Sequence, residues 1–557
     1  MYLRIMAVAV SAYTQVRIEN YIQSVEKDGL AEHGFPRLTA NMGVLVAHGQ
    51  IPEKKETFRR MMDLCCREIP TAKSRNGWRV GNDFSVKEIV LCLLEVEASG
   101  LFPKEQTDGW RTALSSFRPE DAYSCIPEPD DPVAHNWAIF AAASEQMRIF
   151  AGLGGDPAFV ERQIAGQLRF FDANGMYRDP NQPMVYDFVT RLQFAVALKY
   201  GYNGPSRPAL EDALLRSAEP TLLMQSVSGE IPFGGRSNQF LHNETFYCAL
   251  CEFYADWFHR RGDDALAARF RAAALRSAKA LAYWTSQPDF RHVKNRFPLD
   301  THFGCEGYGY FDKYMVTTGS WALLAHLFHS EKISAPSAEP ADSASIFVMS
   351  PSFHRICVNA GGYTAEFDTA ADEHYDANGL GRLQRRGAPP VLCLSVPCPL
   401  HPSYTLDSEN PTPLAILPGW KSGDAWHYAY GADYTLLEQS TEGDTARLVF
   451  SVARENAAPL RWECVLSSEG LSLELSGDDN LALTLPALVF DGETKTDVVS
   501  DAHSLAVRFR GWTCRTESSG DIVDTGLDYS NRNGHLRRYE ARGGSPLRVR
   551  IRITCQQ

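Results

Sequence analysis

The sequence predicts two domains of different class: an α/α toroid, complete or incomplete, followed by an antiparallel β-sandwich. Helical hairpins recur between residues 13 and 330 with a period of about fifty residues, which is typical of stacked helical units. Beyond residue 345, short alternating apolar runs are separated by Gly, Asp, Asn and Pro, as in antiparallel sheets. The predicted domains are therefore 1–330 and 346–557, joined by a Pro/Ser/Ala-rich linker at 331–345.

Each predicted hairpin pairs a helix that is apolar on most faces with an amphipathic one. Residues 138–152 are of the first kind, and residues 158–171 carry Arg and Gln along one stripe. Apolar helices are expected to be buried on most sides, so about six hairpins would place them in an inner ring. An open helical solenoid has the same period. The predicted helix openings are polar or aromatic: Asn41, Asp83, Asn136, Asp187, Asn243 and Tyr314.

In a closed ring the inner helices run parallel, and their amino-terminal ends gather at one end. Those ends carry partial positive charge and unsatisfied N–H groups, which favour an anionic ligand. The polar openings of successive hairpins are therefore expected to line a common cleft.

Composition excludes several classes of function. The net charge of −13 argues against a general nucleic-acid binder, and no apolar run approaches the roughly 20 residues of a membrane span. The 13 cysteines are scattered, and Cys248 and Cys251 lie in an apolar helix without a second pair, so neither a disulfide framework nor a zinc site is predicted. We expect no cofactor and leave a structural divalent metal open. A reducing, cytoplasmic setting is predicted, or a periplasmic or secreted one if an export signal lies outside this chain.

The most informative stretch is 229–257. Its first half is a Gly/Pro-rich loop that carries Arg236, Ser237, Asn238 and Gln239, and its second half opens an apolar helix. Hydrogen-bonding groups on a loop that leads into a buried helix are typical of binding and catalytic sites. A second loop, 372–382, is similarly rich in His, Tyr, Asn and Arg.

The recurrence of Asn, His, Tyr and Arg indicates β-elimination next to a uronic acid. One group must hold the sugar carboxylate, a base must take the C5 proton, and an acid must protonate the departing glycosidic oxygen. The predicted residues are Asn136, Arg236 and Asn243 for the carboxylate, His242 or His135 for the base, and Tyr310 for the acid.

Alternatives for each role lie nearby. Tyr308 and Tyr314 are alternative acids, and His302 and His374 are alternative bases. Further residues are predicted to contact the substrate, namely Trp137, Asn238, Tyr375 and Arg382. Each has a structural interpretation as well, because Asn and His at a helix start also act as caps and a Tyr at helical spacing also packs in a core.

Glycoside hydrolysis is the competing chemistry. It uses two carboxylates, and four lie near the same helix openings: Asp83, Asp187, Glu244 and Glu306. Their separation decides whether any pair could act as acid and base or nucleophile, and N-terminal capping is the structural alternative for the two aspartates. A glycan-binding protein without catalysis is a third hypothesis.

Several motifs resemble a known class of enzymes. The helix opening His135-Asn136-Trp137, the turn at 174–179, the loop at 231–239 and the trailing β domain look like the toroid-plus-sheet polysaccharide lyases. The similarity is greatest to the bacterial L-rhamnose-α-1,4-D-glucuronate lyases, with heparinase II/III-like enzymes more distant. Pro-Phe-Gly followed by Arg-Ser is also similar to a family of α/α-toroid glucuronidases, which are hydrolases.

The lyase resemblance implies cleavage at O4 of a uronate, with a 4,5-unsaturated sugar as product. Carried over to this sequence, the carboxylate grip falls on Asn136, Arg236 and Asn243, and the proton-transfer pair on His242 and Tyr310. The expected partner is an acidic oligosaccharide or polysaccharide. The sequence leaves open the particular uronate and its neighbour, endo or exo action, and the oligomeric state.

Overall fold

The computed structural model describes residues 1–124, 133, 135–180, 184–286, 290–335, 342–478 and 480–556. The chain divides into two compact units. The helical unit comprises Met1–Ala218, Leu241–His292 and Phe311–Ala335, and the sheet unit comprises Glu219–Phe240, Val293–Tyr310 and Pro336–Gln557. The predicted boundary at 331–345 stays a prediction, because residues 336–341 lie outside the described part of the chain.

The helical unit is built from α-helices of 4 to 22 residues. Their bounds are α1 Tyr2–Ser11, α2 Gln15–Asp28, α3 Gly34–Ala47, α4 Lys55–Glu68, α5 Ala72–Asn76, α6 Asn82–Ser99, α7 Lys104–Ser115, α8 Pro119–Ala122, α9 Asn136–Phe150, α10 Pro157–Leu168, α11 Met184–Lys199, α12 Arg207–Arg216, α14 Leu241–Arg260, α15 Asp264–Thr285 and α16 Phe311–Phe328. α13, Ala218–Leu223, falls at the division between the units.

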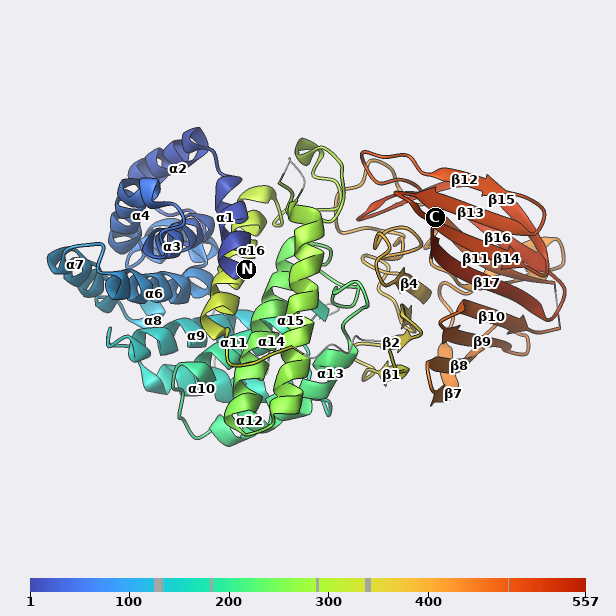
Figure 1. Ribbon diagram of the computed structural model, residues 1–557, viewed down its shortest axis with the longest axis horizontal. Helices are drawn as coiled ribbons and strands as arrows, with labels where there is room; N and C mark the ends of the chain where they lie inside the picture. The colour runs from blue at the N-terminus through green and yellow to red at the C-terminus, as the bar shows by residue number, and fades with distance from the viewer. Residues whose placement is uncertain are drawn as a thin grey trace. The chain divides into compact units, whose positions relative to one another are not determined.

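Six of the described helices close into a ring. Each packs against the next in the order α3, α6, α9, α11, α14 and α16, and α16 packs against α3. A second layer of helices covers this ring, and each outer helix packs against an inner helix (Figure 1). The pairs, outer helix first, are α4 with α3, α7 with α6, α10 with α9, α12 with α11, α15 with α14 and α1 with α16. The predicted α/α toroid is therefore confirmed, and the ring is closed.

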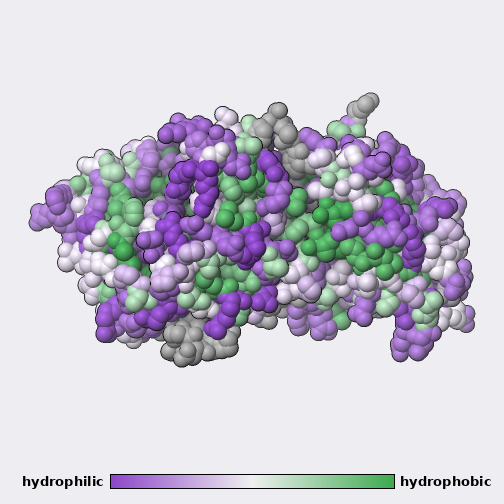
Figure 2. Space-filling model, turned by 90° about the horizontal axis from the view of Figure 1, so that it is seen from below, coloured by the Kyte–Doolittle hydropathy of each residue, from purple (hydrophilic) through white to green (hydrophobic). Residues whose placement is uncertain are grey.

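The two layers differ in burial as their sequences predict. Inner helix α9 is buried from Ala138 to Arg148, whereas its outer neighbour α10 buries only one stripe, which includes Phe159 and Ile164. The polar side chains on the other stripe of such a helix face water. On the face that Figure 2 shows, hydrophilic residues accordingly cover much of the surface, with hydrophobic residues between them.

One predicted helix opening is wrong. α3 begins at Gly34, so Asn41 lies in the middle of the helix, where its Nδ2 donates a hydrogen bond to the Val316 carbonyl at 3.0 Å. A buried amide bound to the neighbouring inner helix resembles a cap when only the sequence is read. The openings at Asn136 and Asn243 are placed well, because α9 begins at Asn136 and α14 begins two residues before Asn243.

The sheet unit is antiparallel throughout its named pairs. Its strands are β1 Ser345–Val348, β2 Arg355–Ala360, β3 Tyr363–Asp368, β4 Gly379–Arg385, β5 Pro418–Ser422, β6 Ala425–Tyr428, β7 Tyr434–Glu442, β8 Thr445–Val452, β9 Leu460–Ser467, β10 Gly470–Ser476, β11 Leu481–Phe490, β12 Asp497–Ser500, β13 Ser504–Phe509, β14 Trp512–Ser518, β15 Asp521–Asn531, β16 Gly534–Gly543 and β17 Leu547–Cys555.

These strands form three sheets in the described residues. Their orders are β1-β2-β3-β4, β12-β13-β14-β17-β10-β9-β8-β7 and β15-β16-β11-β5-β6. Leu485 of the five-stranded sheet and Leu505, Cys514 and Ile551 of the eight-stranded sheet line one narrow internal cavity, so these two sheets pack face to face. On the four-stranded sheet, β2 packs against β8 and β9. The antiparallel β prediction is confirmed.

None of the helices in the described residues is both long enough and apolar enough to span a membrane.

Candidate functional site

The loop 229–239 is held on the four-stranded sheet by buried charged side chains. The Phe233 N–H donates to Glu366 at 2.9 Å, and the Phe233 carbonyl accepts from Arg355 Nε at 2.8 Å. Arg382 pairs with the same Glu366 at 2.7 Å. Because β2, β3 and β4 each supply one of these side chains, the loop conformation is set by the sheet.

Arg355 also fixes the next residues of the loop. It is fully buried, forms ion pairs with Asp368 and with Asp376 (2.7 Å), and its guanidinium lies against Gly234. Gly234 has φ +114°, and a Cβ there would overlap the Arg355 guanidinium, so only glycine fits. The Gly235 N–H then donates to Asp376 at 3.2 Å. Arg236, which follows directly, is therefore carried by a rigid backbone.

A second buried pair supports the end of this loop. Arg532, in the turn between β15 and β16, holds Glu306 in a bidentate pair with distances of 2.9 and 2.7 Å. The same carboxylate accepts the Ser237 N–H at 2.7 Å, and the Ser237 hydroxyl donates to the Tyr308 phenol oxygen at 3.3 Å. Glu306 therefore ties loop 229–239 to the neighbouring loop 293–310.

Tyr375 completes what we call the arginine–tyrosine cluster, which consists of Arg236, Ser237, Glu306, Tyr308, Tyr375 and Arg532. Burial raises the pKa of the Tyr375 phenol, against a hydrogen bond with Ser403 that lowers it. Among the charges that act on this phenol, Glu306 raises its pKa, and Arg236 and Arg532 lower it. Tyr375 is half-buried and Tyr308 is 44% exposed, so one phenol is sheltered and the other is accessible.

His374 precedes Tyr375 on an exposed loop and has a defined tautomer. Its Nδ1 lies 2.8 Å from the His401 carbonyl, and its backbone N–H donates to Asp372 at 2.8 Å. A carbonyl can only accept, so Nδ1 carries the proton, and in the neutral ring Nε2 keeps a lone pair. This nitrogen is therefore in the correct form to act as a base.

The predicted acid Tyr310 lies on the same loop as Tyr308. It is 39% exposed, and its ring stacks on that of His302 with a centroid distance of 3.9 Å and an interplanar angle of 14°. This stacking orders both aromatic side chains at the surface of the sheet unit.

The other predicted residues of the sheet unit are internal. Arg382 belongs to β4 and is fully buried. It forms an ion pair with Glu366 and donates a hydrogen bond to the loop backbone. Asn238 is buried and donates from Nδ2 to the Pro232 carbonyl at 3.1 Å. Their contacts hold the loop rather than face solvent.

In the helical unit, His135 and Asn136 shape the start of α9. His135 is the N-cap, and its Nδ1 accepts the Trp137 N–H at 3.2 Å. Its own N–H is shared by Gln167 at 2.9 Å and the Tyr177 hydroxyl at 3.0 Å. Asn136 is buried and donates from Nδ2 to Asp179 at 2.9 Å. The sequence leaves capping and catalysis open here, and these contacts are those of capping.

His242, Asn243 and Glu244 all lie in the first turn of α14 and are buried. The His242 ring packs edge-on against Tyr314 of α16, with centroids 4.5 Å apart and an interplanar angle of 85°. The predicted pair of an inner-helix histidine and a tyrosine of the next inner helix therefore exists within the helical unit. That His242 meets Arg236 and Tyr310 in one pocket stays a prediction.

Three of the four carboxylates of the hydrolase hypothesis, Asp83, Asp187 and Glu306, make structural contacts. Asp187 forms a fully buried pair with Arg191 at 2.6 Å, and burial raises the pKa of this carboxyl group. Asp83 is buried and accepts the Ser124 N–H at 3.0 Å. Glu306 is held by Arg532 as described above.

Sequence reasoning missed Arg532, Arg355 and Glu366, which organise the cluster. The Asn-Arg-Asn-Gly run at 531–534 is a turn signal, but nothing near it indicates a partner 226 residues away. Among the described residues, no group of three or more His, Cys, Asp or Glu side chains could hold a metal ion, and Cys248 and Cys251 are buried thiols of α14.

No protein-family model and no curated protein matches the sequence. Solved structures with a similar fold include heparinase III, with 9% identity and a TM-score of 0.49 over 95% of this chain and 78% of that chain. A mutant heparan sulfate lyase from Pedobacter heparinus has 10% identity and a TM-score of 0.48, covering 94% and 76%. A GH127 β-L-arabinofuranosidase from Geobacillus stearothermophilus T6 has 10% identity and a TM-score of 0.35, covering 98% of both chains.

Proposed function

We propose that this protein is a carbohydrate-active enzyme, specifically a lyase that cleaves a glycosidic bond at O4 of a uronic acid by β-elimination. One observation carries the proposal: Arg236 follows a backbone that the Arg532–Glu306 pair holds through the Ser237 N–H, with the half-buried Tyr375 phenol near both guanidinium groups. A cationic environment around a protonated phenol suits a substrate that brings its own carboxylate.

The chemistry follows from the side chains. Arg236 would bind the uronate carboxylate and make the C5–H more acidic by stabilising negative charge on the adjacent carboxyl group. His374 Nε2 would take the C5 proton, and Tyr375 or Tyr308 would give a proton to O4 as the C4–O4 bond breaks. The electron pair of the C5–H bond becomes the C4=C5 double bond, so the products are a free hydroxyl group and a 4,5-unsaturated uronate.

His242 and Tyr310 remain the alternative base and acid from the sequence. Glucuronate next to rhamnose is the substrate that the sequence motifs favour. The structures of similar fold comprise both lyases and an arabinofuranosidase, and the buried, paired state of Asp187 and Glu306 favours elimination over hydrolysis by these two carboxylates.

The decisive experiment follows the ultraviolet absorbance of the unsaturated product during incubation with glucuronate-containing oligosaccharides. We expect His374→Ala and Tyr375→Phe each to lower the rate by about 10²–10⁴-fold. His503→Ala is the matched control, because His503 is also exposed and its Nδ1 also lies beside a carbonyl, that of Gly520, at 3.0 Å. It should keep the parent rate.

Each other outcome is informative. Product without ultraviolet absorbance would contradict elimination and support hydrolysis, and binding without turnover would support a glycan-binding protein. A full rate in His374→Ala combined with loss in His242→Ala would move the base to α14. Arg236→Ala should lose turnover with little change in thermal stability, and a large loss of stability would return Arg236 to a structural role.

A further inference from the structure

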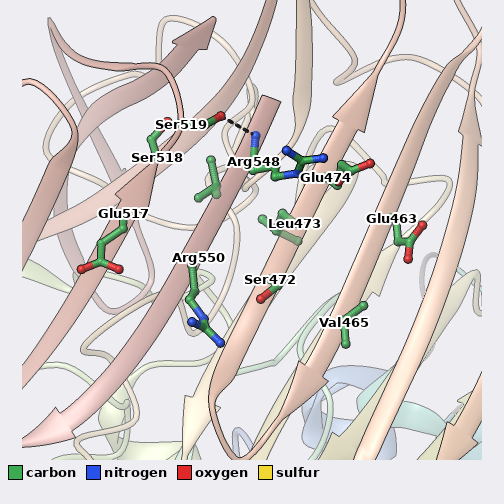
Figure 3. Close-up of a pocket in the computed structure, with 11 residues that line it drawn as sticks. Glu463, Val465, Ser472, Leu473, Glu474, Glu517, Ser518, Ser519, Arg548 and Arg550 are labelled. Carbon is green, nitrogen blue, oxygen red and sulfur yellow. Dashed lines mark hydrogen bonds and ion pairs between the residues drawn. The ribbon is translucent and has the colours of Figure 1, made fainter. Parts of the chain in front are cut away.

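The outer face of the eight-stranded sheet carries a groove that the proposed reaction does not use. It has a volume of about 450 Å³ and crosses β9, β10, β17 and β14 (Figure 3). Outward-facing side chains of these strands line it, including Glu463, Ser472, Glu474, Glu517, Arg548 and Arg550. Charged and hydroxyl side chains project along the groove over an apolar floor that includes Leu473 and Val549, and it lies wholly within the sheet unit.

The carboxylates in this groove have arginine partners. Glu474 pairs with Arg548 at 2.8 Å, and Glu517 pairs with Arg515 at 3.1 Å. Glu463 is held at 2.8 Å by Arg447 of β8, and by Arg461 at the same distance. The negative charge that lines the groove is therefore already compensated by neighbouring guanidinium groups.

Arg550 is the additional cation. It lies opposite Ser472 of β10 and Glu517 of β14 in the strand register, yet in the described part of the chain its side chain has no ion pair or hydrogen bond. Its Nε is shielded from solvent without an acceptor. In Figure 3 the Arg550 guanidinium and the Glu517 carboxylate lie apart, on different strands.

A shielded N–H without an acceptor, such as the Nε–H of Arg550, costs free energy unless a ligand supplies an acceptor. The planar fork of an arginine matches a carboxylate, with which it forms two parallel hydrogen bonds. The hydroxyl of Ser472 on the facing strand adds a group suited to a sugar hydroxyl. The charge complementarity of the groove is thus to an anion that is surrounded by hydroxyl groups.

We propose that this groove is a second, non-catalytic binding site for an acidic oligosaccharide, with Arg550 gripping a uronate carboxylate. The choice of a glycan as ligand rests on the proposed function, whereas the preference for a carboxylate rests on Arg550 itself. Such a site would hold the chain of a polymeric substrate on the enzyme and raise its local concentration at the reaction site.

Binding is best measured by calorimetry in Arg236→Ala protein, which removes the proposed catalytic grip. The probe is a hyaluronan hexasaccharide, whose glucuronate residues carry carboxylates, and maltohexaose is the neutral probe. We expect the hexasaccharide to bind and Arg550→Ala to weaken it by about tenfold or more, since hydrogen bonds to a charged group are lost. Arg552→Ala, on the same face of β17 but paired with Glu469, should bind like the parent.

Three results would overturn the proposal: no binding of the hexasaccharide to the Arg236→Ala protein, equal binding of maltohexaose, or equal binding by the Arg550→Ala and Arg552→Ala proteins. Thermal unfolding of both variants checks that they are folded. Failure of the lyase proposal is seen separately, as absence of the unsaturated product, and loss of binding in Arg550→Ala would still support the groove in that case.

Discussion

Lys87 is fully buried in the toroid, on inner helix α6. Its Nζ donates to the Phe84 carbonyl at 2.6 Å and lies 4.8 and 5.4 Å from the ring centroids of Phe140 and Trp321. Glu88 is 3.6 Å away. Burial lowers the pKa of Lys87 to about 7, and the interaction with Glu88 only partly opposes this shift. The charged form is therefore disfavoured in the folded protein.

This shift predicts how stability depends on pH. An unfolded lysine titrates near pH 10.4, so the folded state releases this proton at a lower pH than the unfolded state does. The contribution of Lys87 to the free energy of unfolding is complete above about pH 10.4, where the lysine is neutral in both states. It is lost as the pH falls to about 7. We expect Lys87→Met to reduce the rise in unfolding free energy between about pH 7 and about pH 10, measured by chemical denaturation.

The control for Lys87 is Lys104→Met. Lys104 is 85% exposed and pairs with Asp108 four residues on, so its removal should leave the pH dependence of stability unchanged. Identical slopes in the Lys87→Met protein and in the parent protein would show that this lysine does not titrate as proposed.

His135, at the start of α9, has both a structural and a catalytic interpretation. The His135 side chain caps the helix, and loss of a cap costs about 1 kcal/mol. We expect His135→Ala to lower the unfolding free energy by about that amount, and His135→Asn to restore it, because asparagine is a strong N-cap. Denaturation and turnover are both measured.

Turnover separates the two roles of His135. A capping residue predicts parent-like rates in His135→Asn. A stable His135→Asn protein without activity would instead assign His135 to the chemistry. Asp156→Ala is the control for loss of a helix cap. Asp156 caps outer helix α10 by accepting hydrogen bonds from two backbone N–H groups, and no catalytic role is predicted for it.

At the scale of the whole molecule, each unit has its own core. Arg355 belongs to the sheet unit, where removal of one partner from a buried ion pair typically costs about 3–5 kcal/mol. We expect Arg355→Ala to lower the thermal transition of the sheet unit and to leave that of the helical unit in place. Scanning calorimetry separates two such transitions.

Arg508→Ala is the matched control for Arg355. Arg508 pairs with Asp497 at 2.7 Å on the surface, and an exposed pair contributes at most about 1 kcal/mol. A single transition that moves as a whole in Arg355→Ala would show that the two units unfold together.

Sequence patterns placed the inner helices because burial on all sides leaves a local signature. α9 and α14 are continuous apolar runs with polar openings, and each helix makes its own backbone hydrogen bonds. Asn41 was misplaced for a related reason: its partner, the Val316 carbonyl, is 275 residues away. A buried polar residue and a cap are alike until that partner is known.

The candidate site shows the same division. Residue type and loop context predict Arg236, Tyr308, His374 and Tyr375 as site residues, since a high density of polar groups on Gly-rich loops is visible locally. The sequence does not show that Arg382 is buried, because its partner Glu366 lies on the neighbouring strand β3. The tautomer of His374 is also absent from the sequence, because it depends on the hydrogen bond that the ring makes with the His401 carbonyl.

The sequence alone determined the succession of helical hairpins and an antiparallel β region, because periodicities of 3.6 and 2 residues are set by neighbours along the chain. Only the tertiary structure decided that the ring is closed, that Glu306 and Arg532 support loop 229–239, and that Arg550 has no partner in the described residues. Those facts depend on ion pairs and packing between residues hundreds of positions apart, and such pairing leaves no local pattern.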